Sequence, residues 1–185
     1  MIKKATQLFI LISALFSLSA CVSLSVTEGD ISSYLQDNMH FEHSVGVENV
    51  MYAQVSVEDL KVKIGRADTD RISVFANTGA QIEMFAKKDM SLDLDIEFSA
   101  VPEYDAKSGE IFLKSLRLEQ FNEKNRTLPP ELETLLKPAV SMIGFALSQQ
   151  PVYKLDDASV QAALLKTAEP NLVIKDNKLV IELLE

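Results

Sequence analysis

Long stretches of this chain alternate apolar and polar residues, and that pattern restricts them to strands with one buried face. In the clearest stretch, residues 91–98, the apolar positions Leu92, Leu94, Ile96 and Phe98 alternate with Asp93, Asp95 and Glu97. Three further stretches, 54–64, 71–85 and 111–121, show the same period. Because polar turns separate them, we expect a largely antiparallel meander with one solvated face and one buried face.

Irregularities in these stretches predict where the strands bend or end. A slip in the alternation near Glu58 and Asp59 indicates a β-bulge. Residues 77–79 (Asn-Thr-Gly) predict a kink or turn, and Pro102 is expected to close a strand. Residues 105–109 predict a hairpin turn.

A change of period from two to between three and four residues marks the longest helix expected in the domain, from Pro130 to Gln149. Proline is favoured at the start of a helix, because backbone N–H groups in the first turn have no partner within the helix and proline has no N–H. The apolar stripe of this helix consists of Leu132, Leu135, Leu136, Ala139, Val140, Ile143 and Leu147. Met142, Phe145 and Ala146 widen the stripe until the second half is apolar over most of its circumference.

Short helices are expected on either side of the meander. One follows Thr27, where Asp30 three residues later completes a form of capping box, and another lies near residues 157–168. The fold class predicted from all these elements is α+β, a curved antiparallel β-sheet wrapped around a long amphipathic C-terminal helix, with short flanking helices.

The N-terminal segment has the anatomy of an export signal. Two lysines precede an apolar run, residues 8–18, which is shorter than the roughly 20 residues that span a bilayer. The sequence Leu18-Ser19-Ala20-Cys21 then resembles the bacterial lipobox, in which the cysteine thiol is diacylated, the chain is cut before the cysteine, and the new amine is acylated. We therefore expect a signal peptide over residues 1–20, a single domain over residues 21–185, and a lipid anchor at Cys21.

The residues after Cys21 bear on the destination of the protein. The residues after the cysteine are Val22 and Ser23, and neither is an aspartate. An aspartate there would resemble the inner-membrane retention signal of enteric bacteria. By that resemblance, its absence implies the outer membrane, with the protein facing the periplasm. Two or more acyl chains anchor a protein stably, so a triacylated Cys21 would suffice for attachment.

The charge of the chain excludes several kinds of partner. The formal net charge is −9, and it becomes −11 when the two lysines of the signal are removed. Nucleic-acid binding needs clustered basic residues, so no nucleic-acid partner is expected. Attraction to anionic lipid through charge alone is disfavoured for the same reason. Cys21 is the only cysteine, so stability must come from packing rather than from a disulfide.

Several motifs resemble the YceB-like family of bacterial lipoproteins. They are Thr27-Glu28 with Ile31, Ile64-Gly65-Arg66, residues 101–105 (Val-Pro-Glu-Tyr-Asp) continuing to residues 109–114, and residues 149–153 (Gln-Gln-Pro-Val-Tyr). The resemblance runs in order over nearly the whole mature chain and includes the lipobox. It implies a fold like that of the tubular lipid-binding (BPI-like) proteins, in which a curved sheet wraps a long helix and leaves an apolar groove.

No residue pattern predicts catalysis or a cofactor. His40 and His43 are the only histidines, too few ligands for a zinc site, so no metal is expected. There is no Gly-x-Ser-x-Gly motif and no free cysteine after acylation, so we expect no catalytic residues and no enzyme. The acidic row of residues 93, 95 and 97 is expected on a solvated strand face, and residues 105–109 lack the glutamate of a calcium loop.

The apolar rows leave two structural interpretations open, a filled core or a groove for a hydrophobic ligand. The candidate groove residues are Leu92, Leu94, Ile96 and Phe98 of the strand and Leu136, Val140, Ile143 and Leu147 of the helix. The predicted function is that of a membrane-anchored periplasmic lipoprotein that binds or shuttles a lipid or other hydrophobic ligand. The alternative is a tethered protein-interaction module that positions or regulates an envelope-biogenesis enzyme.

Overall fold

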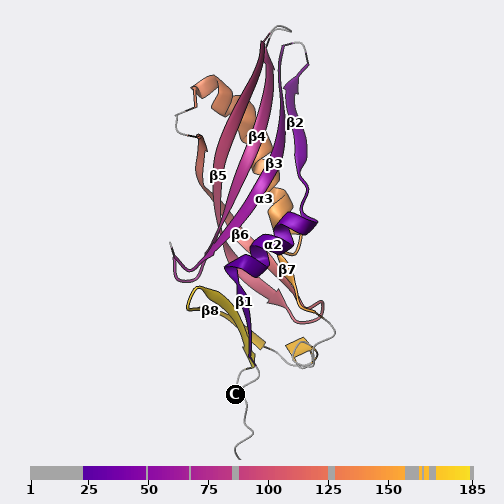
Figure 1. Ribbon diagram of the computed structural model, residues 1–185, viewed down its shortest axis with the longest axis vertical. Coiled ribbons are helices and arrows are strands. Elements are labelled where there is room, and N and C mark those ends of the chain that lie inside the picture. The colour runs from indigo at the N-terminus through magenta and orange to yellow at the C-terminus, as the bar shows by residue number, and fades with distance from the viewer. Residues whose placement is uncertain are drawn as a thin grey trace, which may run out of the picture.

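The computed structural model describes residues 23–48, 50–66, 68–84, 88–124, 128–156, 163, 165–166 and 170–183. Cys21, the expected signal peptide and most of the expected helix near residues 157–168 lie outside them. The described residues form two antiparallel sheets and two complete helices along one long axis (Figure 1). No described helix is long and apolar enough to cross a bilayer.

The larger sheet has six strands in the order β2-β3-β4-β5-β6-β7. They are β2 (Glu42–Val47), β3 (Met51–Ile64), β4 (Ile72–Met84), β5 (Lys88–Asp105), β6 (Glu110–Glu123) and β7 (Tyr153–Lys154). β7 pairs only with Glu110 and Ile111 at the start of β6. Among the described residues, the rest of β6 is therefore a free edge of the sheet.

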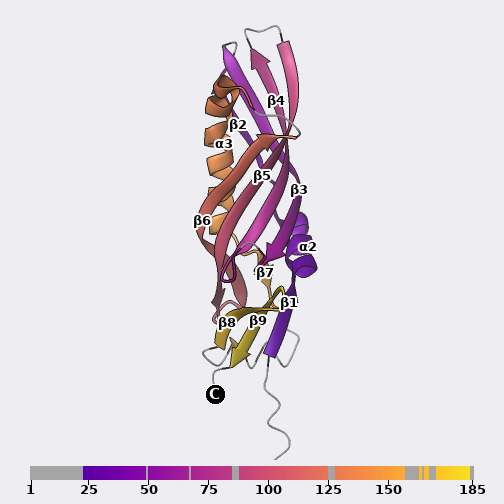
Figure 2. The same ribbon diagram turned by 90° about the vertical axis from the view of Figure 1, so that its left-hand side faces the viewer.

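The smaller sheet lies at the end of the molecule where the chain enters the domain (Figures 1 and 2). Its strands, in the order β1-β9-β8, are β1 (Ser23–Thr27), β9 (Lys178–Leu183) and β8 (Pro170–Lys175). Helix α2 (Glu28–Asn38) follows β1 without a loop. Its capping box is confirmed, because the Asp30 amide donates to Thr27 Oγ1 at 3.2 Å and the Thr27 amide donates to Asp30 Oδ2 at 2.8 Å.

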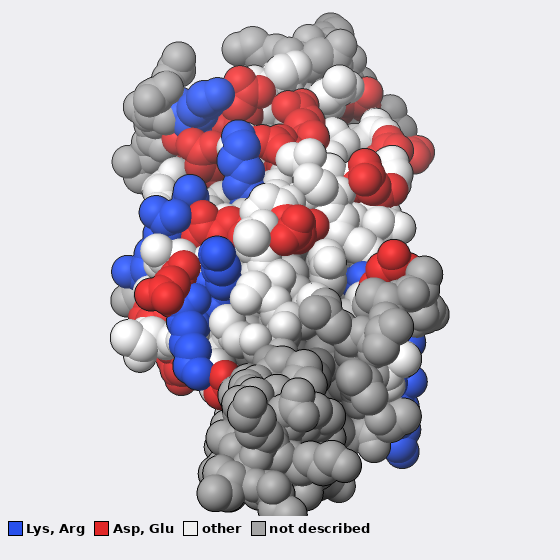
Figure 3. Space-filling view, turned by 60° about the horizontal axis from the view of Figure 1, so that its bottom comes forward, with Lys and Arg blue, Asp and Glu red and all other residues white. Residues whose placement is uncertain are grey.

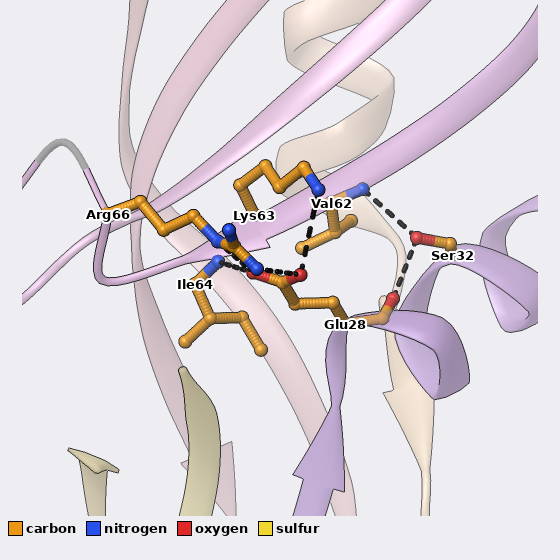
Figure 4. A network of polar contacts seen from close by, with 6 residues as sticks. All are labelled: Glu28, Ser32, Val62, Lys63, Ile64 and Arg66. Atoms are coloured by element: carbon orange, nitrogen blue, oxygen red, sulfur yellow. Dashed lines mark hydrogen bonds and ion pairs between the residues drawn. The ribbon is translucent and has the colours of Figure 1, made fainter. Parts of the chain in front are cut away.

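Glu28, in the first turn of α2, attaches this helix to the end of β3 (Figure 4). Its carboxylate accepts a hydrogen bond from the Ile64 amide at 2.9 Å and two from the Arg66 guanidinium, each at 2.8 Å. One turn later, the Ser32 hydroxyl accepts from the Val62 amide at 3.0 Å and donates to the Glu28 carbonyl at 2.7 Å. Side chains of α2 thus satisfy two backbone donors of β3 that would otherwise lack partners.

The Glu28 carboxyl is stabilised in its charged form. Burial on its own would raise the pKa of this group. The hydrogen bonds from Arg66 and Ile64, together with the positive charges of Arg66 and Lys63, outweigh burial and hold the pKa below its ordinary value. The ionised carboxylate therefore contributes to the stability of the native state.

Helix α3 (Pro130–Gln149) has the bounds that the sequence predicts and lies along one face of the larger sheet (Figure 2). It contacts β2, β3 and β6. Its buried residues are Leu132, Leu136, Ala139, Val140, Ile143, Gly144 and Leu147. They pack against the inward rows of the strands, so the main core lies between α3 and the sheet.

The predicted fold class, α+β with a sheet wrapped around a long C-terminal helix, is wrong. Most described residues lie in strands, in two sheets, and α3 is followed by β7, β8 and β9. The strands are longer than expected, because the breaks predicted at residues 77–79 and at Pro102 do not interrupt the chain. β4 runs through the first of them, and β5 continues past Pro102 to Asp105.

Candidate functional site

An open groove of about 500 Å³ lies between α3 and β6. Strand β5 contributes Phe98 to its lining, and β6 contributes Leu113, Lys114, Ser115, Leu116 and Leu118. Helix α3 contributes Ser141, Gly144, Phe145, Ser148 and Gln149. This volume is within the range of small-molecule sites, and the large side chains in the lining are mostly apolar.

Small residues on α3 make room for the groove. Ser141, Gly144 and Ser148 are three and four residues apart, so they share one side of the helix. A Cβ atom at Gly144 would lie 3.0 Å from Cε1 of Phe98, closer than van der Waals contact. Glycine at this position therefore lets the Phe98 ring lie directly against the helix.

Two large apolar side chains of the groove remain in contact with water. Phe145 on α3 is 58% exposed, and Leu118 on β6 is 44% exposed. Fully burying a side chain of this size contributes about 1.5–3 kcal/mol, so a ligand that covered both would gain a substantial part of that. The lining contains Lys114 and no carboxylate, although the chain as a whole is acidic.

Two bulges shape the β6 wall of the groove. Glu97 pairs with Gln120 and Phe98 with Leu118, so Glu119 is an extra residue on β6. Ser99 then pairs with Arg117 and Val101 with Lys114, which leaves a second extra residue within 115–116. Ser115 adopts a φ of 51°, a left-handed conformation that is uncommon for residues other than glycine.

The eight predicted groove residues come together in space, but nearly all of them lie inside the core. Leu92, Leu94, Ile96, Leu136, Val140, Ile143 and Leu147 are buried between the sheet and α3. Phe98 is also buried, and it alone of the eight lines the open groove. Ligand contact by the other seven stays a prediction, as does the anchor at Cys21, which lies outside the described residues.

The residues that open the groove were not among the candidates. Phe145 belongs to the part of α3 that is apolar over most of its circumference. Apolar residues beyond the stripe that faces the core were the sequence feature that could have indicated the groove. Leu116 and Leu118 alternate with charged residues like any half-buried strand, so their pattern carries no signal for a groove.

The charged residues that the structure describes do not form a cluster of the kind that holds a metal ion. Within the described residues, no group of three histidine, cysteine or acidic side chains is placed to hold a metal ion. His43 lies in β2 and contacts the ring of Phe41. In the view of Figure 3, acidic and basic side chains are interleaved beside a band of uncharged surface.

The fold and the groove define a strand-rich domain with an apolar site beside its long helix. The chain belongs to the family described as "Protein of unknown function (DUF1439)", whose match covers residues 26–178. The proteins called "Uncharacterized lipoprotein YceB" from Escherichia coli (strain K12) and Salmonella typhimurium are 23% and 21% identical to it over 159 residues. Each alignment covers 85% of this chain and 84% of the relative, which confirms the resemblance seen in the motifs.

A solved structure shows a weaker similarity to this chain. The chain described as "Crystal structure of lipopolysaccharide binding protein" is 16% identical, with a TM-score of 0.33. The match covers 87% of the present chain and 49% of that one, so this chain spans about half the length of that structure.

Proposed function

We propose that this protein is a lipoprotein held at the outer membrane through acylated Cys21, facing the periplasm, and that it binds a lipid or another hydrophobic molecule in the groove between α3 and β6. The named relatives are lipoproteins, and the lipobox-like sequence ending at Cys21 supports the same attachment here. The role is one of binding rather than catalysis.

The observation that carries this proposal is the open apolar groove itself. Phe145 and Leu118 are exposed in a concave site, where an apolar chain can contact both at once. The Phe98 ring against Gly144 adds a third apolar surface to the same concavity. Such a site, rather than scattered apolar residues on a flat face, is what hydrophobic ligands bind.

The edge of β6 favours an apolar chain over a peptide. A peptide that added a strand here would need regular backbone donors and acceptors along the edge. The two bulges interrupt that ladder, and charged residues such as Lys114, Arg117 and Glu119 follow the edge. Bulges and charges are the means by which proteins protect sheet edges from strand addition.

The point of attachment places the domain close to the membrane. Strand β1 begins at Ser23, two residues after Cys21, and two extended residues span at most about 7 Å. The smaller sheet is then the part nearest the bilayer, and the larger sheet extends away from it (Figure 1).

Replacing the proposed anchor tests the attachment directly. The variant Cys21→Ser is expected to lose labelling by radioactive palmitate and to leave the membrane fraction, or to accumulate uncleaved, because serine offers no thiol to acylate. Ser23→Ala, two residues further on, serves as the control and should keep both properties. Palmitate labelling and membrane sedimentation of Cys21→Ser would refute the anchor.

Site-specific photocrosslinking in cells tests the groove on the full chain. A benzophenone amino acid at position 118 or 145 is expected to yield lipid adducts by mass spectrometry, whereas one at Phe75 is not. Phe75 is an exposed aromatic residue of β4 that does not line this groove. Adding Phe145→Asp should weaken binding, and so the adduct at position 118, by about tenfold or more, since burying a phenylalanine contributes about 1.5–3 kcal/mol.

A matched variant separates a local effect from a general one. Met142→Asp changes a residue of α3 that is 40% exposed and does not line the groove, so it should leave the adduct at position 118 unchanged. Protein adducts without lipid adducts at positions 118 and 145 would instead favour the tethered interaction module.

A further inference from the structure

Arg71, the residue directly before β4, is a buried charged residue that lies behind the β6 wall of the groove. Its exposed fraction is 7%. Its guanidinium donates to Ser99 Oγ and to the Ser99 carbonyl, each at 3.0 Å, and to the Ser115 carbonyl at 2.7 Å. Among the described residues Arg71 makes no ion pair with a carboxylate, so backbone carbonyls and a hydroxyl satisfy it instead.

These contacts reach both bulges of β6. Ser115 lies in one bulge and has the left-handed φ of 51°. Glu119 is the extra residue of the other, and its carboxylate accepts a hydrogen bond from the same Ser99 hydroxyl that accepts from Arg71. One buried guanidinium and one serine thus connect the two irregular points of the strand.

A strained backbone conformation persists only where the surrounding structure holds it in place. At Ser115 the Arg71 hydrogen bond supplies that restraint, and Ser115 itself lines the groove with Leu116 and Leu118. Without the restraint β6 would relax toward a regular edge strand, which narrows the groove and offers a free edge for strand addition.

We infer that Arg71, acting with Ser99, is the positioning residue of the groove, holding both bulges of β6 so that the site takes an apolar chain and refuses an extended peptide. This inference rests on the proposed function for its ligand, and on the contacts of Arg71 alone for the shape of the wall.

Hydrogen–deuterium exchange on the full chain, purified in detergent, measures the wall without reference to a ligand. In Arg71→Met, the amides of residues 114–119 are expected to exchange about tenfold faster or more, while those of β3 keep their rates. Ser99→Ala should show a smaller increase in the exchange of the same amides. If Arg71→Met fails to fold, the exchange rates of Ser99→Ala alone test the inference. Ser73→Ala removes a buried serine that pairs with Ser99 in the sheet but makes none of these contacts, so it should change nothing.

A rescue experiment tests the role of strain at Ser115. Glycine adopts a positive φ without steric cost, so Arg71→Met combined with Ser115→Gly should recover part of the slow exchange. In the crosslinking assay, Arg71→Met should lose the lipid adduct at position 118 and gain protein adducts there.

The two readouts separate failure of this inference from failure of the proposed function. Slow exchange at residues 114–119 in folded Arg71→Met and Ser99→Ala overturns the inference, and so does faster exchange with an unchanged lipid adduct. Faster exchange in a protein whose unaltered form carries no lipid adduct supports the positioning of the wall by Arg71, and it removes the proposed ligand.

Discussion

Replacing Leu136 with alanine is expected to lower the free energy of unfolding by about 3–5 kcal/mol, because this side chain is fully buried. Leu136 is fully buried on the face of α3 that packs against the sheet. Truncation there removes apolar contacts and leaves a cavity that rigid neighbours do not fill. Urea denaturation followed by circular dichroism measures the change.

The same variant decides between the two interpretations of the apolar rows. If Leu136 lined an open ligand groove, the unliganded protein would lose little stability, and a change below about 1 kcal/mol would show this. Met142→Ala is the matched control on the same helix, since Met142 is 40% exposed. Its effect should stay within about 1 kcal/mol.

Removing the carboxylate of Glu28 is expected to cost about 2–3 kcal/mol, as charge-assisted hydrogen bonds to partly buried groups do. In Glu28→Ala the Ile64 amide loses its acceptor, and the first turn of α2 loses a negative charge that favours the helix N-terminus. Asp59→Asn, which removes an ion pair with Lys61 on the surface of β3, is the control and should have a smaller effect.

The pH dependence of stability follows from the lowered pKa of Glu28. A carboxyl whose pKa is lower in the folded state binds fewer protons there than in the unfolded state. Its contribution is therefore fully present above the ordinary value of 4.5 and is lost as the pH falls through the lower folded pKa. In Glu28→Gln this part of the acid sensitivity should disappear, and an unchanged acid profile would contradict the role given to Glu28.

Features that depend on neighbours in the sequence were predictable. The bounds of α3, the capping box of Thr27 and Asp30, the hairpin turn at residues 105–109 and the bulge in β3 near Glu58 are all confirmed. Each depends on a proline, a short polar side chain, a glycine or a break in alternation, which act within a few residues.

Features that depend on distant partners were not predictable. Residues 77–79 suggested a kink or turn, but β4 continues through them. The Glu58 carboxylate, from the bulge of β3, lies 2.7 Å from where a Cβ of Gly79 would be. The glycine thus lies within a continuous strand, beside a side chain of the neighbouring strand, and marks no turn. The strand content was underestimated partly because of two such breaks, at residues 77–79 and at Pro102, which shortened the expected strands.

Most of the lining of the groove escaped prediction for the same reason. The β6 wall depends on register shifts between β5 and β6. It also depends on hydrogen bonds from Arg71 to Ser99 and Ser115, which lie 28 and 44 positions further along the chain. Arg71 looks in the sequence like an ordinary polar residue at a strand start. Only the pairing of the strands reveals that it is buried behind β6.

The direct passage from β1 into α2 also determines how the domain transmits force. A domain held by its N-terminus is pulled through Ser23, along the axis of β1. Because this pull runs along β1, it loads the pairs with β9 in shear, from Ser23–Glu182 to Thr27–Lys178 together, and does not separate them one after another. Past Thr27, Glu28 passes the tension to Ile64 and Arg66 at the end of β3. Strand β1 thus transmits force from the N-terminal attachment to the six-stranded sheet.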